Sequence, residues 1–183
     1  MTSTFDRDVA INAILYVAER IGKKKDMHKI FKTLYFADKY HLSRYGRTIT
    51  GDNYIAMEYG PVPSRISDFF KSVRGDSFFP AGEFAKYFHF VNRYMIEPDL
   101  KADLDYLSES DIECLNEAID LCKDKSFREL CDVSHDYAWN ETKKNSQINI
   151  GDILRECCES EAYIDYINSN IRFERDFCNA TAY

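Results

Sequence analysis

Asp38 and His41 are the residues of this 183-residue sequence whose types and spacing come nearest to acid–base chemistry. Both fall on the apolar face of one helical stretch, at about 100° per residue, with Arg47 or Arg65 in reach from the following segment. A carboxylate on such a face is costly to bury unless it is paired or hydrogen-bonded. Two interpretations follow: a reactive acid–base pair in a cleft, or a buried polar clasp that holds the next segment to the helix.

The clasp is favoured because the sequence lacks the other parts of a catalytic site. It contains no G-x-S-x-G, no H-E-x-x-H and no C-x-x-C pair. His135 and Trp139, four residues apart, are interpreted likewise as a packed pair. We therefore predict no catalytic residue, no metal and no cofactor. The predicted clasp consists of Asp38, His41, Arg47, His135 and Trp139, and a small hydrolase that uses Asp38 and His41 is the alternative.

A phosphate-binding loop is suggested by glycine spacing and then excluded by the residues that follow. Gly46 and Gly51 are spaced as in a Walker A loop, but Asp52 and Asn53 come next, where that loop requires Lys and Ser or Thr. A carboxylate at that place would repel a phosphate. The sequence also has no G-x-G, so nucleotide binding is not expected.

Charge and aromatic content indicate a protein-binding surface. Acidic residues outnumber basic ones by 31 to 24, for a net charge of −7, which disfavours nucleic acid and suits a basic partner. The sequence has 13 tyrosines and 13 phenylalanines, and an aromatic core whose hydroxyls reach solvent accounts for some of them. Tyrosine suits interfaces because it combines apolar area with a polar tip. Stacking on RNA bases would need interleaved basic residues, whereas acidic residues outnumber basic ones here.

The sequence carries no export or membrane signal. No window approaches the roughly 20 apolar residues that span a bilayer, and the first residues lack a basic region followed by an apolar run. We predict a cytoplasmic protein whose six cysteines are reduced and mostly in the core. The adjacent Cys157 and Cys158 are a candidate redox pair, although burial is the favoured interpretation.

The first part of the sequence predicts the elements that position these residues. Apolar spacing predicts a helix over 6–21 that ends at Gly22, and a second helix from the capping Asp26 to about Arg44, stopped by Gly46. Residues 48–59 read as a short strand pair around Gly51, Asp52 and Asn53. Gly60-Pro61-Val62-Pro63 is then expected to break the strand, because proline cannot donate to a ladder.

The remainder is predicted to be mainly helical. A helix from Pro63-Ser64 closes at Gly75, a loop covers 76–83, and residues 84–95 are aromatic and β-rich with a turn at Asn92-Arg93. Later helices are predicted to begin at Ser108 and near Asp152. Another begins at Ser126 and continues through Ala138, and a final one runs from Glu161 to about Cys178. We predict one α+β domain over 1–183: mostly helical, with a small antiparallel hairpin after the second helix and a C-terminal helical extension over 150–183.

Two blocks of this sequence resemble the Panacea domain, also called SocA-like. Residues 31–70 carry its pattern K-x-L-Y-x-A-D…H…G-R-x-I-T-G-D…Y…G-P-V-P, and a second block contains Leu107-Ser108, Ser126-Phe127-x-x-Leu130, Ser134-His135 and Trp139. The best-matching blocks are 26–75 and 107–139. Thr48 departs from the pattern, since family members often have proline after G-R.

The resemblance implies an antitoxin of a bacterial or phage type II toxin–antitoxin pair. Such domains neutralise a toxin encoded nearby by direct, stoichiometric contact, and the toxins often block translation. Some instead deliver the toxin to a ClpXP-type protease, for which the tail from Phe173 to Tyr183 is a candidate docking segment. Some members carry a DNA-binding region, which this acidic chain gives no reason to expect. We expect the toxin contact at Tyr54, Met57, Tyr59, Gly60, Pro61, Val62 and Pro63.

Overall fold

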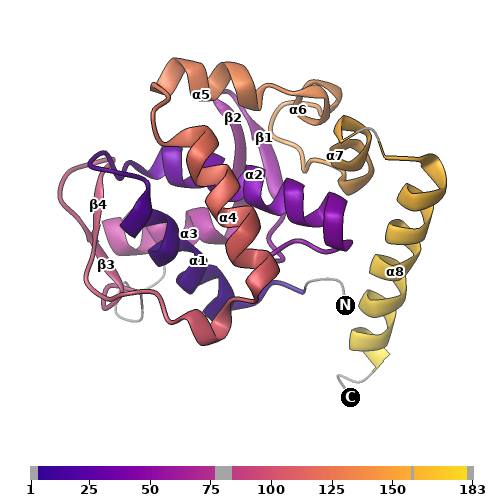
Figure 1. Cartoon of the computed structure of the whole chain (residues 1–183), viewed down its shortest axis with the longest axis horizontal. Helices are drawn as coiled ribbons and strands as arrows, with labels where there is room; N and C mark the ends of the chain where they lie inside the picture. Colours follow the sequence, from indigo (N-terminus) through magenta and orange to yellow (C-terminus); the bar gives the residue numbers. More distant parts are fainter. Residues whose placement is uncertain (1–3, 77–83, 158, 181–183) are drawn as a thin grey trace.

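Helices make up most of the computed structural model, which describes residues 4–76, 84–157 and 159–180 (Figure 1). With 58% helix and two small antiparallel sheets, the predicted mostly helical α+β class is confirmed. The helices are α1 (Arg7–Arg20), α2 (Met27–Tyr45), α3 (Ser64–Arg74), α4 (Glu109–Cys122), α5 (Phe127–Ser134), α6 (Tyr137–Glu141), α7 (Ile150–Glu156) and α8 (Glu161–Ala180), with a 3-10 turn, η2, at Leu104–Tyr106. The strands are β1 (Tyr54–Met57), β2 (Gly60–Pro63), β3 (Phe88–Phe90) and β4 (Ile96–Pro98).

Helix ends follow the capping residues of the sequence. The side chain of Asp26 accepts a hydrogen bond from Lys29 N at the start of α2, and Gly46 ends that helix in the left-handed region at φ 73°. Ser108 opens α4 and Ser126 opens α5, each with a complete capping box. These predicted boundaries are confirmed.

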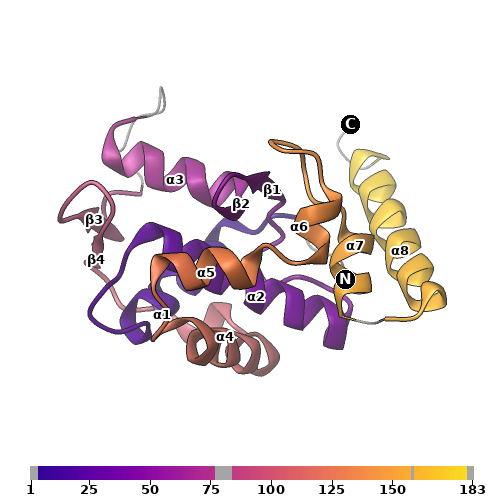
Figure 2. The same cartoon turned by 90° about the horizontal axis from the view of Figure 1, so that it is seen from above.

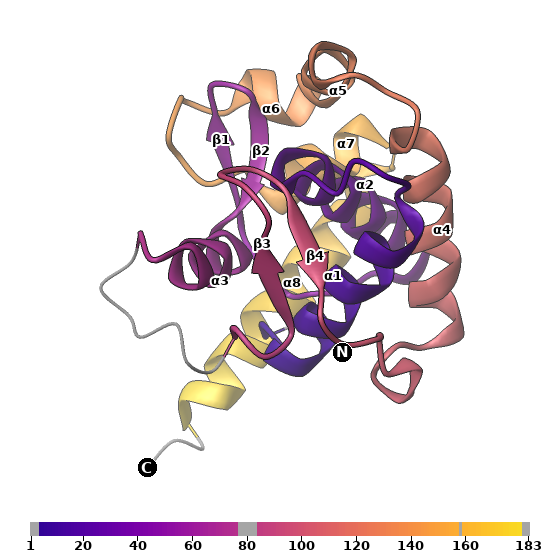
Figure 3. The ribbon, with the colours of Figure 1, turned by 90° about the vertical axis from the view of Figure 1, so that its left-hand side faces the viewer.

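Helix α2 is the central element of the core. It packs against α4 on one side and against strand β2 on the other, as Figure 3 shows end-on. Because α2 has neighbours on several sides, polar positions such as Lys32, Asp38 and His41 are buried along with its apolar residues. The core therefore has to satisfy several polar side chains internally.

The hairpin after α2 differs from the prediction. β1 pairs with β2 in the register Tyr54↔Pro63 to Met57↔Gly60, so Gly60–Pro63 is a strand rather than a strand breaker. Thr48 to Thr50 do not form a strand. Pro61 and Pro63 are tolerated because they lie opposite Ala56 and Tyr54, whose backbone groups bond instead to residues 145–148. Proline's missing N–H is therefore not needed at those two positions.

Three other boundaries also differ. The second strand of the later hairpin begins at Ile96, beyond the predicted region 84–95, because a loop intervenes in which Asn92 Oδ1 accepts from the N–H groups of Tyr94 and Met95. The helix predicted from Ser126 through Ala138 is broken after Ser134, since Asp136 caps a new helix, α6. Helix α7 begins at Ile150 after the cap Asn149, two residues before the predicted start.

The C-terminal helices lie at one end of the molecule. Helix α8 is at the end opposite to β3 and β4, as Figures 1 and 2 both show. It is attached through its buried Ile164 and Ile167. Residues 77–83 of the predicted loop, Cys158 of the predicted redox pair and the last three residues of the predicted docking tail lie outside the described residues. In the described part of the chain, no helix is both long and apolar enough to cross a bilayer.

Candidate functional site

The predicted contact segment exposes its turn and buries its base. Met57 and Tyr59 are 41% and 56% exposed, and Val62 is half-buried. The other four predicted contact residues, Tyr54, Gly60, Pro61 and Pro63, are buried. Only the turn of the hairpin therefore offers large side chains to a partner.

Phe127, which is not among the predicted contact residues, lies beside that turn. Its side chain is 53% exposed, and its ring centroid is 5.4 Å from that of Tyr59 and 4.2 Å from that of His28. The signal in the sequence was an aromatic residue directly after the helix cap Ser126, where helix geometry does not require burial. Met57, Tyr59 and Phe127 together form what we call the hairpin-tip surface.

The base of this surface is tightly packed on α2. Gly60 has φ 92°, and a Cβ added there would lie 2.4 Å from Ser134 Oγ and 3.0 Å from Lys32 Nζ. Lys32 is fully buried, and its Nζ donates a 2.7 Å hydrogen bond to Pro61 O. Burial is the main reason that the pKa of Lys32 falls to about 7. The turn is therefore held from below by close contacts.

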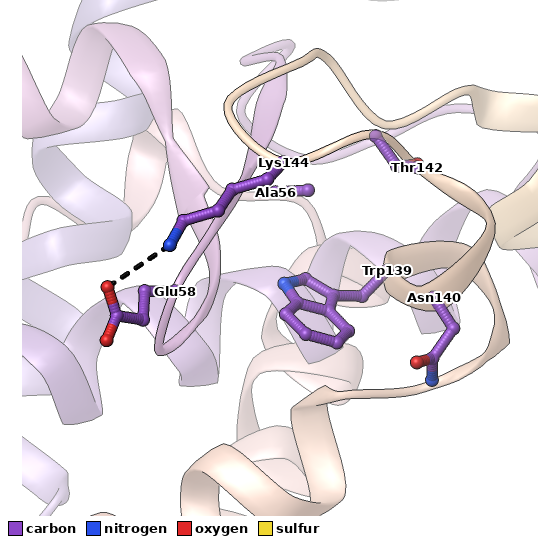
Figure 4. Close-up of a pocket in the computed structure, with 6 residues that line it drawn as sticks. All are labelled: Ala56, Glu58, Trp139, Asn140, Thr142 and Lys144. Carbon is purple, nitrogen blue, oxygen red and sulfur yellow. Dashed lines mark hydrogen bonds and ion pairs between the residues drawn. The ribbon is translucent and has the colours of Figure 1, made fainter.

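A second support for the turn comes from α6. Trp139 Nε1 donates a 2.9 Å hydrogen bond to Met57 O, and the Trp139 ring stacks on His135 with centroids 3.7 Å apart. His135 and Trp139 are close as predicted, although they belong to the end of α5 and to α6 rather than to one helix. Beside the indole lies a pocket of about 240 Å³, shown in Figure 4. It is lined by Ala56, Glu58, Trp139, Asn140, Thr142 and Lys144.

Asp38 connects the middle of α2 to the strand that leads to the turn. Its carboxylate accepts hydrogen bonds from Ile49 N, Thr50 N, Thr50 Oγ1 and Tyr54 Oη, at 2.6 to 3.1 Å. Burial raises the pKa of Asp38, and these four donors oppose that rise. All four donors lie between the end of α2 and the first residue of β1, so the carboxylate fixes where the hairpin leaves the helix.

His41 belongs to a separate network. Its Nδ1 donates to Arg47 O at 2.8 Å, while Nε2 lies 2.9 Å from Ser110 Oγ and 3.1 Å from Asp111 Oδ1. Arg47 Nη2 also donates to Asp111, at 2.8 Å. Burial alone would raise the pKa of Asp111, but the hydrogen bonds and the Arg47 charge lower it to about 2. Asp38 and His41 thus share no hydrogen-bond partner.

Arg65, the other arginine considered for the clasp, points elsewhere. Its guanidinium lies over the ring of Phe5, 5.1 Å from the centroid. Cys114, Cys122, Cys131 and Cys157 are free, and the first three of them are buried. In the described ranges, no group of three or more His, Cys, Asp or Glu side chains is arranged to hold a metal.

Comparison with models of protein families assigns the chain to one family. The model of the family "Antitoxin SocA-like, Panacea domain" matches residues 30–140, more than half of the sequence. The chain belongs to this family. No curated protein and no solved structure matches the chain.

The Panacea match covers most of α2, the hairpin, Phe127 and Trp139, and leaves out α1, α7 and α8. The family indicates an antitoxin role and, in general, a toxin as the partner. The matched range includes every residue of the hairpin-tip surface and four of the six residues that line the pocket, while Thr142 and Lys144 lie beyond it.

One buried network of this Panacea domain was missed from the sequence. Lys39 Nζ pairs with Asp136 at 2.9 Å and with Glu156 at 3.4 Å, and Tyr35 Oη donates to Asp136 at 2.8 Å. These residues join α2 to α6 and α7. Nothing local in the sequence signals the pairing, because Lys39 and Asp136 are 97 positions apart.

Proposed function

We propose that this Panacea-domain protein is an antitoxin that neutralises a cognate toxin by direct, stoichiometric binding, and that the hairpin-tip surface is part of the contact. The main support for this contact surface is that Met57, Tyr59 and Phe127 are exposed side by side on a tightly packed base. Aromatic side chains held rigidly before binding are typical of interface hot spots. Little conformational entropy is lost when such a surface is covered.

The charge of the chain supports a basic partner. A net charge of −7 attracts a positively charged protein surface and speeds the encounter. Toxins that block translation by acting on RNA need basic surfaces to hold phosphates. An antitoxin with these properties would neutralise such a toxin by covering that surface.

The polar clasp has a place in this proposal. Asp38 ties the start of β1 to α2, and His41 and Arg47 tie the preceding loop to α4. His135 and Trp139 support the turn itself, through the hydrogen bond to Met57. We propose that these residues do no chemistry and that they hold the hairpin in its binding position.

Co-expression with the protein encoded next to this chain tests the proposal. We expect that protein to arrest growth alone, that co-expression restores growth, and that the two co-purify in equal amounts. Growth arrest that persists together with a failure to co-purify would refute the proposal. The toxin amount distinguishes sequestration from the protease-adaptor alternative, because an adaptor lowers the toxin level in cells with a ClpXP-type protease and not in cells without it.

The structure offers no support for the hydrolase alternative. The side chains of Asp38 and His41 are 2% and 0% exposed, and each is bonded to its own set of partners. A base and an acid that act on a substrate must reach it within hydrogen-bond distance.

A further inference from the structure

In the pocket beside Trp139, the N–H and O–H groups of Trp139, Asn140 and Thr142 already donate hydrogen bonds within the protein. The side-chain acceptors of the pocket are left for a ligand. Trp139 Nε1 donates to Met57 O, and Asn140 Nδ2 donates to two backbone carbonyls of the preceding turn, both at 2.8 Å. Thr142 Oγ1 donates to a backbone carbonyl four residues earlier. What remains for a ligand is the Asn140 amide oxygen, the Thr142 lone pairs and the Glu58 carboxylate. The pocket therefore suits a group rich in donors.

One cation already lies at this position, and it is weakly held. Lys144 Nζ is 3.3 Å from Glu58 Oε2, and the two side chains are 64% and 62% exposed (Figure 4). Ion pairs exposed to this degree contribute little stability. Lys144 can swing into solvent at small cost, and this would leave Glu58 free to pair with another cation.

The indole provides an aromatic surface for such a cation. His135 stacks on one face of Trp139 and does not line the pocket, so an incoming group meets the other face. Burial, and next the charge of Lys32, lower the pKa of His135, which keeps it uncharged at neutral pH. His135 itself therefore adds no positive charge behind the ring.

We propose that this pocket receives an arginine side chain of the bound toxin, a proposal that rests on the antitoxin function proposed above. A guanidinium has five donors and no acceptor, it is planar, and it stacks on indole. It would lie on the exposed face of Trp139 and pair with Glu58 in place of Lys144. Glu58 lies between Met57 and Tyr59, so the pocket adjoins the hairpin-tip surface.

Trp139 is the single tryptophan of the chain, so its fluorescence reports directly on the pocket. The experiment titrates N-acetyl-arginine amide into the full chain at pH 7.5, with N-acetyl-citrulline amide as the uncharged probe of the same shape. We expect a saturable change with a roughly millimolar dissociation constant, as befits one charged contact. Citrulline amide should bind at least about tenfold more weakly, because it lacks the charge.

Three variants sharpen the test. Glu58→Gln should weaken binding of the arginine amide about tenfold, through loss of a charge-assisted hydrogen bond. Lys144→Gln should tighten it about two- to threefold, by removing the competing cation. Glu141→Gln is the matched control, since Glu141 is exposed next to Asn140 but does not line the pocket. It should behave as the wild type.

The proposal is overturned if the arginine amide gives no saturable change, if citrulline amide binds equally well, or if Glu58→Gln and Glu141→Gln behave alike. None of these measurements uses the toxin. Binding of the arginine amide together with a failure to co-purify a toxin would therefore contradict the antitoxin function while leaving the cation pocket intact. Co-purification without amide binding would contradict the pocket alone.

Discussion

Lys32 Nζ donates a 2.7 Å hydrogen bond to the carbonyl oxygen of Pro61, at a place where the lysine side chain has no solvent exposure. No ion pair among the described residues includes Lys32. The bond ties the hairpin to the N-terminal third of the central helix. It also leaves an amine buried directly beneath the exposed turn, where its protonation affects the stability of the binding surface.

Stability should rise with pH because of Lys32. In the folded protein its pKa is about 7, against 10.5 for the ordinary side chain, so between these values the unfolded chain binds more protons. The free energy of unfolding should then rise by up to about 1.4 kcal/mol per pH unit above pH 7. Urea unfolding of the wild type and of Lys32→Met at pH 6, 7.5 and 9 measures this. Parallel pH profiles for the two proteins would contradict the prediction.

Asp38→Asn should destabilise the fold although it keeps the shape of the side chain. The NH2 group of the asparagine would face donors that now bond to a carboxylate oxygen. Some of these donors would then have no acceptor. We expect a loss of roughly 2 to 4 kcal/mol in urea unfolding. Tyr54→Phe, which removes only one of the four donors, should cost about 1 to 2 kcal/mol. An Asp38→Asn protein as stable as Tyr54→Phe would show that the carboxylate is not the centre of this network.

Gly60→Ala should cost more than the backbone conformation alone explains. Gly60 and Gly22 have nearly the same φ, 92° and 94°, but a Cβ at Gly22 meets nothing within 4 Å, while one at Gly60 overlaps Ser134 Oγ. We expect Gly22→Ala to lose about 1 kcal/mol of unfolding free energy and Gly60→Ala roughly 2 to 4 kcal/mol. Adding Ser134→Ala to Gly60→Ala should recover part of the difference. Equal losses at the two glycines would show that the turn is not tightly packed.

Tyr59→Ala and Phe127→Ala should each weaken toxin binding by at least about tenfold, because exposed aromatics at an interface carry much of its affinity. Their thermal unfolding should be nearly unchanged, since both side chains are more than half exposed. Tyr166→Ala is the matched control, with 61% exposure on α8, at the end of the molecule opposite to β3 and β4. Calorimetric titration with the purified toxin measures the effect. A similar loss in Tyr166→Ala, or none in Tyr59→Ala, would place the contact elsewhere.

Much of the helical framework was predictable because caps act locally. Asp26, Ser108 and Ser126 each accept a hydrogen bond from the backbone N–H three residues ahead, so the residues needed to predict each helix start are neighbours in the chain. The break after Ser134 was missed for a related reason. Asp136 is a good cap, but the apolar spacing continues past it and favours an unbroken helix.

Residues 60–63 show why the hairpin was misread. Gly-Pro-Val-Pro looks like a strand breaker when taken alone, because proline lacks a donor. It forms a strand here because, at Pro61 and Pro63, a backbone N–H would point away from β1. The hydrogen bonds between β1 and β2 therefore do not need it. That outcome depends on the register between two strands and on residues 145–148, which lie far away in the sequence.

The sequence by itself determined the family, the α+β class, most helix starts and the acidic charge, because each of these depends on composition or on residues close together in the chain. Only the tertiary structure decided that Asp38 and His41 serve separate networks, that Lys32 lies buried beneath Pro61, and that Phe127 stands next to Tyr59. Lys32 and Pro61 are 29 positions apart in the sequence, and Tyr59 and Phe127 are 68 positions apart. The separation of the Asp38 and His41 networks depends on which face of α2 each neighbour covers. Side-chain burial and partner choice are properties of the packed chain, and no local pattern contains them.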